Sequence, residues 1–88
     1  MRFQFDPAKA AGNLRKHGVP FADAEGVFRD PLALHREDPD AEVEPRFVAV
    51  GTGSASRVLV VVYTLRGSEI RLISVRRATR REVETYEG

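Results

Sequence analysis

The sequence predicts one α+β domain over residues 1–88, with two N-terminal helices, a four-stranded antiparallel meander sheet and a C-terminal helix. Three observations predict this class. Apolar residues recur at intervals of three and four up to Phe28, and from Leu32 onward the period changes to two. The chain then ends in a segment that opens with a helix-capping motif. At this length the chain can build one hydrophobic core and no more.

The first helix is expected to begin at Asp6-Pro7 and to end at Gly18. Asp accepts hydrogen bonds from the free amides of the first turn, Pro fits the first helical position, and Gly adopts the positive φ of a C-terminal cap. We expect an inward stripe of Ala10, Ala11 and Leu14. The opposite face then carries Lys9, Asn13 and Lys16, with His17 beside them. Residues 2–5, before this helix, alternate polar and apolar side chains and can form a short leading strand.

A second helix is predicted from about Pro20 to Phe28, because apolar residues keep core spacing there and Asp30-Pro31 ends it. The region of period two then predicts four strands, near residues 32–37, 45–51, 57–65 and 69–77. The connections between them are short, which favours antiparallel pairing between consecutive strands.

The end of the chain carries more specific signals. The apolar run from Val58 to Val62 has no polar alternation and is typical of an inner strand that is covered on both faces. Thr79 and Glu82 match a capping box at the start of the last helix. Tyr86 lies on the inward side of that helix, so its ring is expected in the core with its hydroxyl free to reach the rim of a site.

The composition excludes several classes of protein. With 42% apolar and 31% charged residues, the chain is an ordinary globular protein and not a disordered one. It has no cysteine, which excludes disulfides and thiolate metal sites. The longest apolar run, Val58 to Tyr63, is far shorter than the ~20 residues that span a bilayer. We therefore expect a soluble cytoplasmic protein without membrane contact.

A net charge of +1 hides a strong polarity along the chain. Residues 29–56 hold three basic and six acidic side chains, which gives −3, whereas residues 57–88 hold seven arginines and four glutamates, which gives +3. Twelve of the fourteen strong bases are arginine, whose planar fork suits bidentate phosphate recognition. The arginine-rich last third is therefore the part expected to bind a polyanion.

A series of separated motifs runs along the chain. In the first third they are Phe5-Asp6-Pro7-x-Lys9, Asn13-x-x-Lys16-His17-Gly18 and Phe21-x-x-Ala24-x-x-Val27-Phe28-x-Asp30-Pro31. The last third contains Arg71-x-Ile73-Ser74-x-Arg76-x-Ala78-x-x-x-Glu82-x-x-x-Tyr86. In this order the motifs resemble the BrnT toxin family from residue 3 to residue 87. The chain departs at Pro20, where the family often has a serine, and at Asp6, where a tryptophan is common.

The resemblance implies a type II toxin with a RelE-like fold, an endoribonuclease that a co-encoded antitoxin of the BrnA type keeps inactive. RNA is the implied substrate, and contact with DNA is expected only through the antitoxin complex. No cofactor and no metal are implied. The acidic segment 38–44 lacks the glycine and the spacing of an EF-hand, so it predicts no metal site either.

RNA carries its own nucleophile, the 2′-hydroxyl, so a protein can cleave it by aligning that oxygen and stabilising the developing charge. Such a site needs a group that removes a proton, a group that returns one, and cations around the phosphate. The catalytic candidates are His17, Lys16, Lys9, Arg76 and Glu82. The candidates for RNA binding are Arg71, Arg77, Arg80, Arg81 and Tyr86. Alternation along a strand predicts that Arg71 and Arg77 share one face and that Arg76 takes the other.

Each candidate has an alternative interpretation. His17 can be a cation favoured at a helix C-terminus, and the two lysines can form a solvated face. Glu82 is also explained as the partner of the Thr79 cap. Arg80 and Arg81 lie where the helix dipole disfavours cations, which favours a binding role unless an acidic neighbour compensates. The alternative functions are a non-catalytic RNA- or DNA-binding module and a protein-interaction domain.

Overall fold

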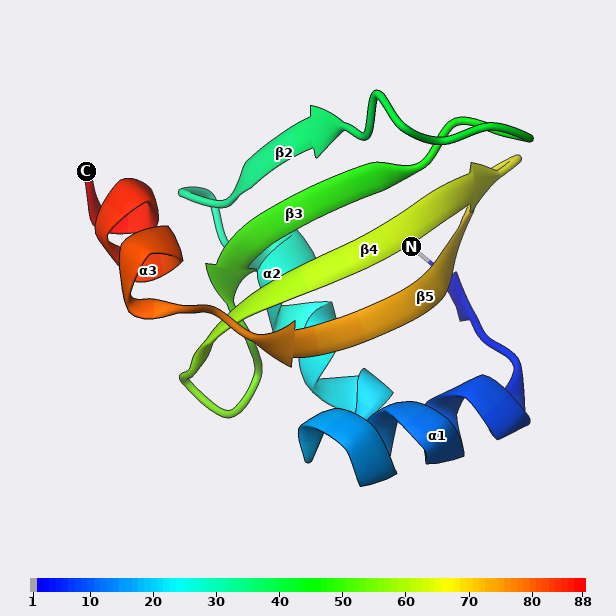
Figure 1. The fold of residues 1–88 in the computed structure, drawn as a ribbon, viewed down its shortest axis with the longest axis horizontal. Helices are drawn as coiled ribbons and strands as arrows, with labels where there is room; N and C mark the ends of the chain where they lie inside the picture. The colour runs from blue at the N-terminus through cyan, green and yellow to red at the C-terminus, as the bar shows by residue number, and fades with distance from the viewer. Residues whose placement is uncertain (1) are drawn as a thin grey trace.

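A five-stranded sheet forms the centre of the molecule, in the spatial order β1-β5-β4-β3-β2. The computed structural model describes residues 2–88 (Figure 1). The strands are β1 (Arg2–Gln4), β2 (Leu34–Glu37), β3 (Phe47–Thr52), β4 (Val58–Arg66) and β5 (Glu69–Arg77). The helical segments are α1 (Pro7–His17), the 3₁₀ helix η1 (Phe21–Ala24), α2 (Glu25–Arg29) and α3 (Arg80–Glu87).

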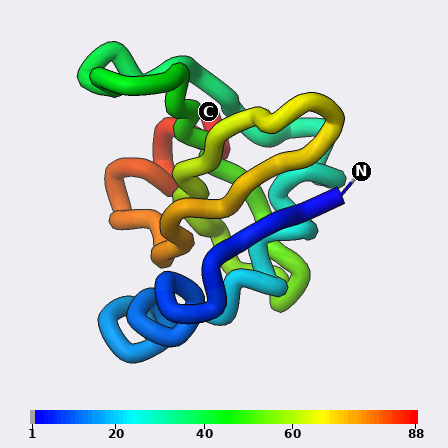
Figure 2. The backbone as a smooth tube through the Cα atoms, turned by 90° about the vertical axis from the view of Figure 1, so that its right-hand side faces the viewer, coloured from blue at the N-terminus to red at the C-terminus, as the bar shows by residue number. Residues whose placement is uncertain are grey.

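The predicted four-stranded antiparallel meander with two N-terminal helices is wrong. The fold is α+β, but β1 adds a fifth strand that runs parallel to β5, with Arg2 opposite Glu69 and Gln4 opposite Arg71 (Figure 2). The remaining pairs are antiparallel. The predicted second helix is divided between η1 and α2. Parallel pairing joins segments far apart in the chain, so the local pattern that predicts a hairpin carries no signal for it.

The hydrophobic core lies between the sheet and the segments α1, η1 and α2. Val19, Phe21 and Val27 pack against side chains of the three inner strands, among them Ala49, Leu59, Val61 and Val75. In Figure 1, α2 lies behind the sheet, while α3 stands at the end where β3 finishes. As predicted, the run Val58–Val62 belongs to the central strand β4, and Val60 is buried on the face opposite the core.

Helix α1 attaches to the sheet by a side that differs from the prediction. Asn13, expected on the outer face, is buried with 7% of its surface exposed, whereas Leu14, expected inside, is 49% exposed. The Asn13 amide donates to the carbonyl oxygens of Val19 at 3.0 Å and Val75 at 2.8 Å, and its Oδ1 accepts from the N–H of Val75 at 3.1 Å. The Asn13 side chain thus binds the backbone of β5 beyond the point where pairing with β1 ends. Its burial satisfies backbone polar groups that would otherwise lack partners.

The predicted helix ends are confirmed. Asp6 caps α1 by accepting from the N–H of Ala8 at 2.9 Å, and Gly18 ends the helix at φ +70°, a backbone conformation that glycine adopts without strain. Thr79 and Glu82 form the expected capping box of α3. Among the helices of residues 2–88, none has the length and apolar character needed to cross a membrane.

Candidate active site

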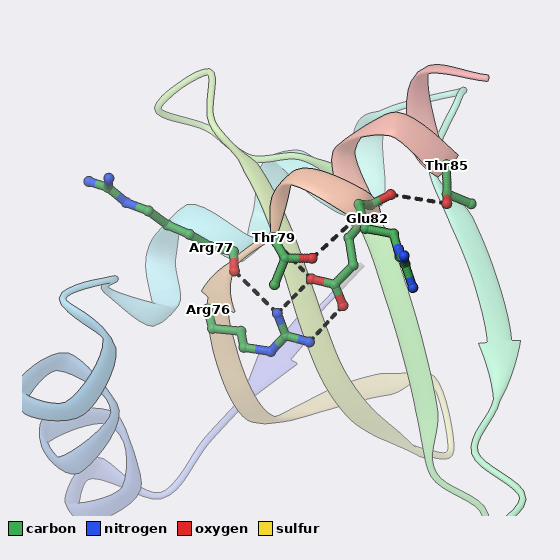
Figure 3. A network of polar contacts seen from close by, with 6 residues as sticks. Arg76, Arg77, Thr79, Glu82 and Thr85 are labelled. Atoms are coloured by element: carbon green, nitrogen blue, oxygen red, sulfur yellow. Dashed lines mark hydrogen bonds and ion pairs between the residues drawn. The ribbon is translucent and has the colours of Figure 1, made fainter.

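A bidentate ion pair joins Arg76 to Glu82 (Figure 3). Arg76 lies near the end of β5, and Glu82 lies in the first turn of α3. Nη1 of Arg76 donates to Oε1 of Glu82 at 2.7 Å, and Nη2 donates to Oε2 at 2.8 Å. Oε1 also accepts from the backbone N–H of Thr79 at 2.7 Å. The capping box therefore fixes the carboxylate, and the carboxylate fixes the guanidinium.

One edge of the Arg76 guanidinium remains free for a ligand. Besides its bond to Glu82, Nη1 donates to the carbonyl oxygen of Arg77 at 3.2 Å. The Nε–H and the second Nη2–H share the opposite edge, and neither has a partner among residues 2–88. Arg76 can thus bind an oxyanion through this edge while Glu82 holds the other.

The ion pair changes the acidity of both partners. Hydrogen bonds from Arg76, assisted by the N–H of Thr79, lower the pKa of Glu82 to about 2. The same hydrogen bonds to Glu82 raise the pKa of Arg76. Glu82 is therefore ionised near neutral pH, where it is a weak base and has no proton to donate.

A hollow of about 300 Å³ lies beside this pair, on the face of the sheet opposite the core. Its floor consists of aliphatic side chains from β2, β3 and β4: Leu34, Val48, Val50 and Val60. Three arginines from three different elements contribute to its lining: Arg36, Arg76 and Arg81. Glu82 is the one acidic residue in that lining. The hollow therefore combines an apolar floor with a positively charged rim.

Strand pairing explains how this hollow is built. One row across the sheet runs, partner by partner, through Leu34, Val50, Val60 and Arg76. In a neighbouring row Arg36 pairs with Val48. Alternate residues of a strand point to the same face, so these side chains share one face, while intervening residues such as Ala49, Leu59 and Val61 enter the core. The floor is apolar and yet lies outside the core.

A bulge in β5 changes the predicted distribution of its arginines. Val62 pairs with Ser74, but the next residue of β4, Tyr63, pairs with Leu72, so Ile73 is an extra residue. As a result Arg71 and Arg76 lie on the same face, and Arg77 lies on the other. The prediction that Arg71 and Arg77 share a face is therefore wrong. Figure 3 shows the side chain of Arg77 pointing away from the ion pair.

The predicted RNA-binding residues of α3 occupy different surroundings. Arg81 lines the hollow, whereas Arg80 is 95% exposed and lies 3.6 Å from Glu84, an acidic neighbour that compensates its charge. The Tyr86 hydroxyl is not free. It bonds to the carboxylate of Asp30 and lies 2.9 Å from Oγ1 of Thr52. The bond to Asp30 raises the pKa of Tyr86.

Lys9, Lys16 and His17 lie together, but not beside Arg76. They line a second hollow of about 290 Å³ between α1 and β5, to which Ile73 and Ser74 also contribute. The two hollows share no lining residue. Both border the C-terminal part of β5, and His17 is half-buried at the end of α1. The structure thus divides the predicted catalytic residues into two groups on either side of one strand.

Several residues of this region were not predicted from the sequence. Arg36 and the valines of the floor belong to the hollow, and Asp30 and Thr52 hold the end of α3. Asp30 accepts from the backbone N–H groups of Thr52 and Leu32, both at 2.9 Å, which lowers the pKa of Asp30. The alternation of Val48 and Val50 was the available signal, because both faces of this strand are apolar.

Comparisons with known proteins identify the family of the chain. Residues 5–82 match the family model described as the ribonuclease toxin, BrnT, of type II toxin-antitoxin systems. The structure is similar to a crystal structure of the Brucella abortus ribonuclease toxin, BrnT, with a TM-score of 0.69 and 27% sequence identity, covering 91% of this chain and 99% of that one. A search of the curated proteins found no match. Because the family model spans most of the sequence and includes both Arg76 and Glu82, the chain belongs to the BrnT family of ribonuclease toxins of type II toxin-antitoxin systems.

Proposed function

We propose that this protein is a metal-independent endoribonuclease that cleaves RNA through attack of a 2′-hydroxyl on the adjacent phosphate. The observation that carries the proposal is the Arg76 guanidinium, which Glu82 holds at 2.7 and 2.8 Å while its other edge has no partner among residues 2–88. A cation that is fixed before the substrate arrives stabilises developing charge without the cost of reorganisation. A phosphate is the ligand that this edge fits best.

In this proposal Arg76 binds the non-bridging oxygens of the scissile phosphate, and Glu82 keeps the guanidinium in place. The negative charge of Glu82 beside the phosphate is balanced by Arg36 and Arg81, which line the same hollow. Arg71 lies on the same face of β5 and binds a neighbouring phosphate. Arg77, Arg80 and Tyr86 contribute less, because Arg77 points away, Arg80 pairs with Glu84, and the Tyr86 hydroxyl is occupied.

We assign proton removal from the 2′-hydroxyl to His17, with Lys9 and Lys16 as cations along the strand. RNA that crosses β5 reaches both hollows, because each borders this strand. The 2′-oxygen gives its proton to His17 and forms a bond to phosphorus, the bond to the 5′-oxygen breaks, and that oxygen takes up a proton from water. The products are a 2′,3′-cyclic phosphate and a 5′-hydroxyl end.

The test incubates the purified protein with end-labelled RNA in EDTA and identifies the product ends. We expect cleavage in chelator, cyclic phosphate ends, and no cleavage of DNA of the same sequence, which lacks the nucleophile. Loss of activity in EDTA that magnesium restores would falsify this mechanism. Full activity of a folded His17→Ala variant would remove His17 from the reaction without affecting the role of Arg76.

The neutralising partner is proposed to be a BrnA-type antitoxin that covers Arg76, Arg80 or Arg81. Such a partner must bring acidic or apolar groups to this end of the molecule and bury about 1,200 Å² or more. Reversing the charges in an Arg80→Glu/Arg81→Glu variant should weaken the complex and make it less sensitive to salt. The measurement is a titration of the neighbouring gene product at two salt concentrations. Unchanged affinity at both would mean that the partner binds elsewhere.

A further inference from the structure

The hollow beside Arg76 has a floor that a phosphate does not need. Above the buried Val60, the side chains of Leu34, Val48 and Val50 offer apolar surface that water must cover when no ligand is present. Leu34, on the edge strand β2, is 47% exposed. An apolar floor beside a phosphate-binding arginine is suited to a ligand with one anionic and one apolar part.

The rim gives the sign of the ligand's charge. Arg36 comes from β2, Arg76 from β5 and Arg81 from α3, so cations border the floor from three elements. Neither Arg36 nor Arg81 forms an ion pair within residues 2–88. The acidic side chain of Glu82 is already paired with Arg76. Guanidinium groups also provide flat surfaces on which a base can stack.

The size of the hollow limits what fits. Its volume is about 300 Å³, and an adjoining hollow of about 170 Å³ shares Leu34, Arg36, Val48, Val50 and Thr85 with it. This is the lower end of the range for small-molecule sites. It can take one flat ring system, whereas the side chains of a docked protein helix would need a longer groove.

We propose that this hollow holds one unpaired base of the RNA, next to the phosphate bound at Arg76. The inference rests on the proposed function. Phosphate contacts position a nucleic acid, and the enclosed base fixes which bond lies at Arg76. The aliphatic floor contacts the flat face of any base but has no hydrogen-bonding groups with which to distinguish the edges of different bases. The site therefore requires unpaired RNA and discriminates weakly among the four bases.

The test compares an RNA that is cleaved at one bond with versions in which a nucleotide beside that bond lacks its base but keeps its ribose and phosphates. Removing the base that enters the hollow should slow cleavage about tenfold, the usual effect of losing one base contact. If removing each of the two flanking bases in turn leaves the cleavage rate unchanged in both cases, the proposal is overturned. This comparison requires no protein variant.

Protein variants then locate the effect. Leu34→Ala removes part of the floor and should reduce the preference for the intact RNA about threefold or more, because cleavage of the intact RNA falls further than cleavage of the base-free RNA. Leu65→Ala is the matched control, because Leu65 is a strand residue that is 54% exposed and does not line the hollow. Val48→Phe, which fills the floor, is a second variant with the same expected result. An equal loss on both RNAs would assign Leu34 to the fold alone.

Binding distinguishes failure of this inference from failure of the proposed function. An RNA with a 2′-deoxy nucleotide at the cut cannot be cleaved but can still bind, with or without the neighbouring base. If the wild type cleaves no RNA yet binds the intact form more tightly, the base site stands and the ribonuclease proposal fails. If Leu34→Ala weakens the antitoxin complex and leaves base discrimination unchanged, the hollow belongs to the partner and the inference is overturned.

Discussion

The two faces of the sheet are covered in opposite ways. On one face α1, η1 and α2 bury an apolar core that includes Val27, Val61 and Val75, and each of these is fully buried. On the other face stands α3, a helix with no buried residue of its own. The first face obtains its stability from apolar area removed from water, and the second is held by hydrogen bonds and ion pairs.

This difference separates stability from binding. Helix α3 is attached at one end by the pair of Arg76 with Glu82 and at the other by Tyr86 with Asp30 and Thr52. Polar attachments of half-exposed groups contribute little to folding, but they fix side-chain positions closely. Substitutions on the open face should therefore change activity more than stability, and those on the core face should do the reverse.

The largest expected effect is on activity and comes from Arg76→Ala. Losing one preorganised charge contact raises the barrier by about 3–4 kcal/mol, or roughly 100- to 1000-fold in rate. Arg77→Ala is the matched control, because its side chain points away from the pair, and it should change the rate less than about threefold. Arg76→Lys should restore only part of the rate, since a lysine cannot bind bidentately. A folded Arg76→Ala protein with wild-type cleavage would transfer the phosphate site to another arginine.

The largest expected effect on stability comes from Asn13→Ala, on the core face. The substitution leaves the N–H and carbonyl of Val75 and the carbonyl of Val19 without their partner, which should cost about 3 kcal/mol of unfolding free energy. Leu14→Ala, one residue further along and half-exposed, should cost less than about 1 kcal/mol. Urea unfolding of both variants checks this. Equal losses would mean that Asn13 is not the attachment of α1.

The sequence predicts those elements whose signals are local. The caps of α1 and α3 are correct because Asp6, Gly18 and Thr79 act within one turn of their own helix. The parallel pairing of β1 and the burial of Asn13 are not predicted, because each depends on β5, which lies more than sixty residues further along the chain. A polar residue at helical spacing is read as exposed unless its distant partner is known.

Within the candidate site too, the sequence predicts the features with local signals and misses those that depend on strand pairing. Arg76 and Glu82 are both predicted as site residues, and their pairing follows from a short connection between β5 and α3. The face of Arg71 is predicted wrongly, because one extra residue in β5 reverses the alternation beyond it. Arg36 is missed, because only the register of β2 with β3 brings it beside the valine floor. The local alternation of side chains does not mark where an extra residue enters a strand.

A smaller effect is expected from Tyr86→Phe, which removes the attachment at the C-terminal end of α3. Asp30 keeps its hydrogen bonds from Thr52 and Leu32, so no buried acceptor is left alone and the loss should be about 1 to 1.5 kcal/mol. Hydrogen exchange of the α3 amides should rise more than that of β4. If exchange rises uniformly across the molecule, α3 does not open more readily than the sheet, and the proposed difference in stability between the two faces is wrong.

The smallest expected effect is the pH dependence that Glu82 contributes. Its pKa falls from 4.5 to about 2 on folding, so its stabilising contribution is fully present above about pH 4.5 and is lost as the pH falls through 2. Both partners are partly exposed, so solvent screening limits this contribution to about 1 kcal/mol. Urea unfolding at pH 6 should show Glu82→Gln less stable than wild type by about that amount, and at pH 2.5 the difference should shrink.

Glu84→Gln, on the same helix with its 3.6 Å contact to Arg80, is the control and should stay within about 0.5 kcal/mol of wild type at both pH values. If Glu82→Gln is as stable as wild type at pH 6, the side chain acts only as a neutral cap, because a glutamine can still accept from the N–H of Thr79 although it cannot balance the charge of Arg76.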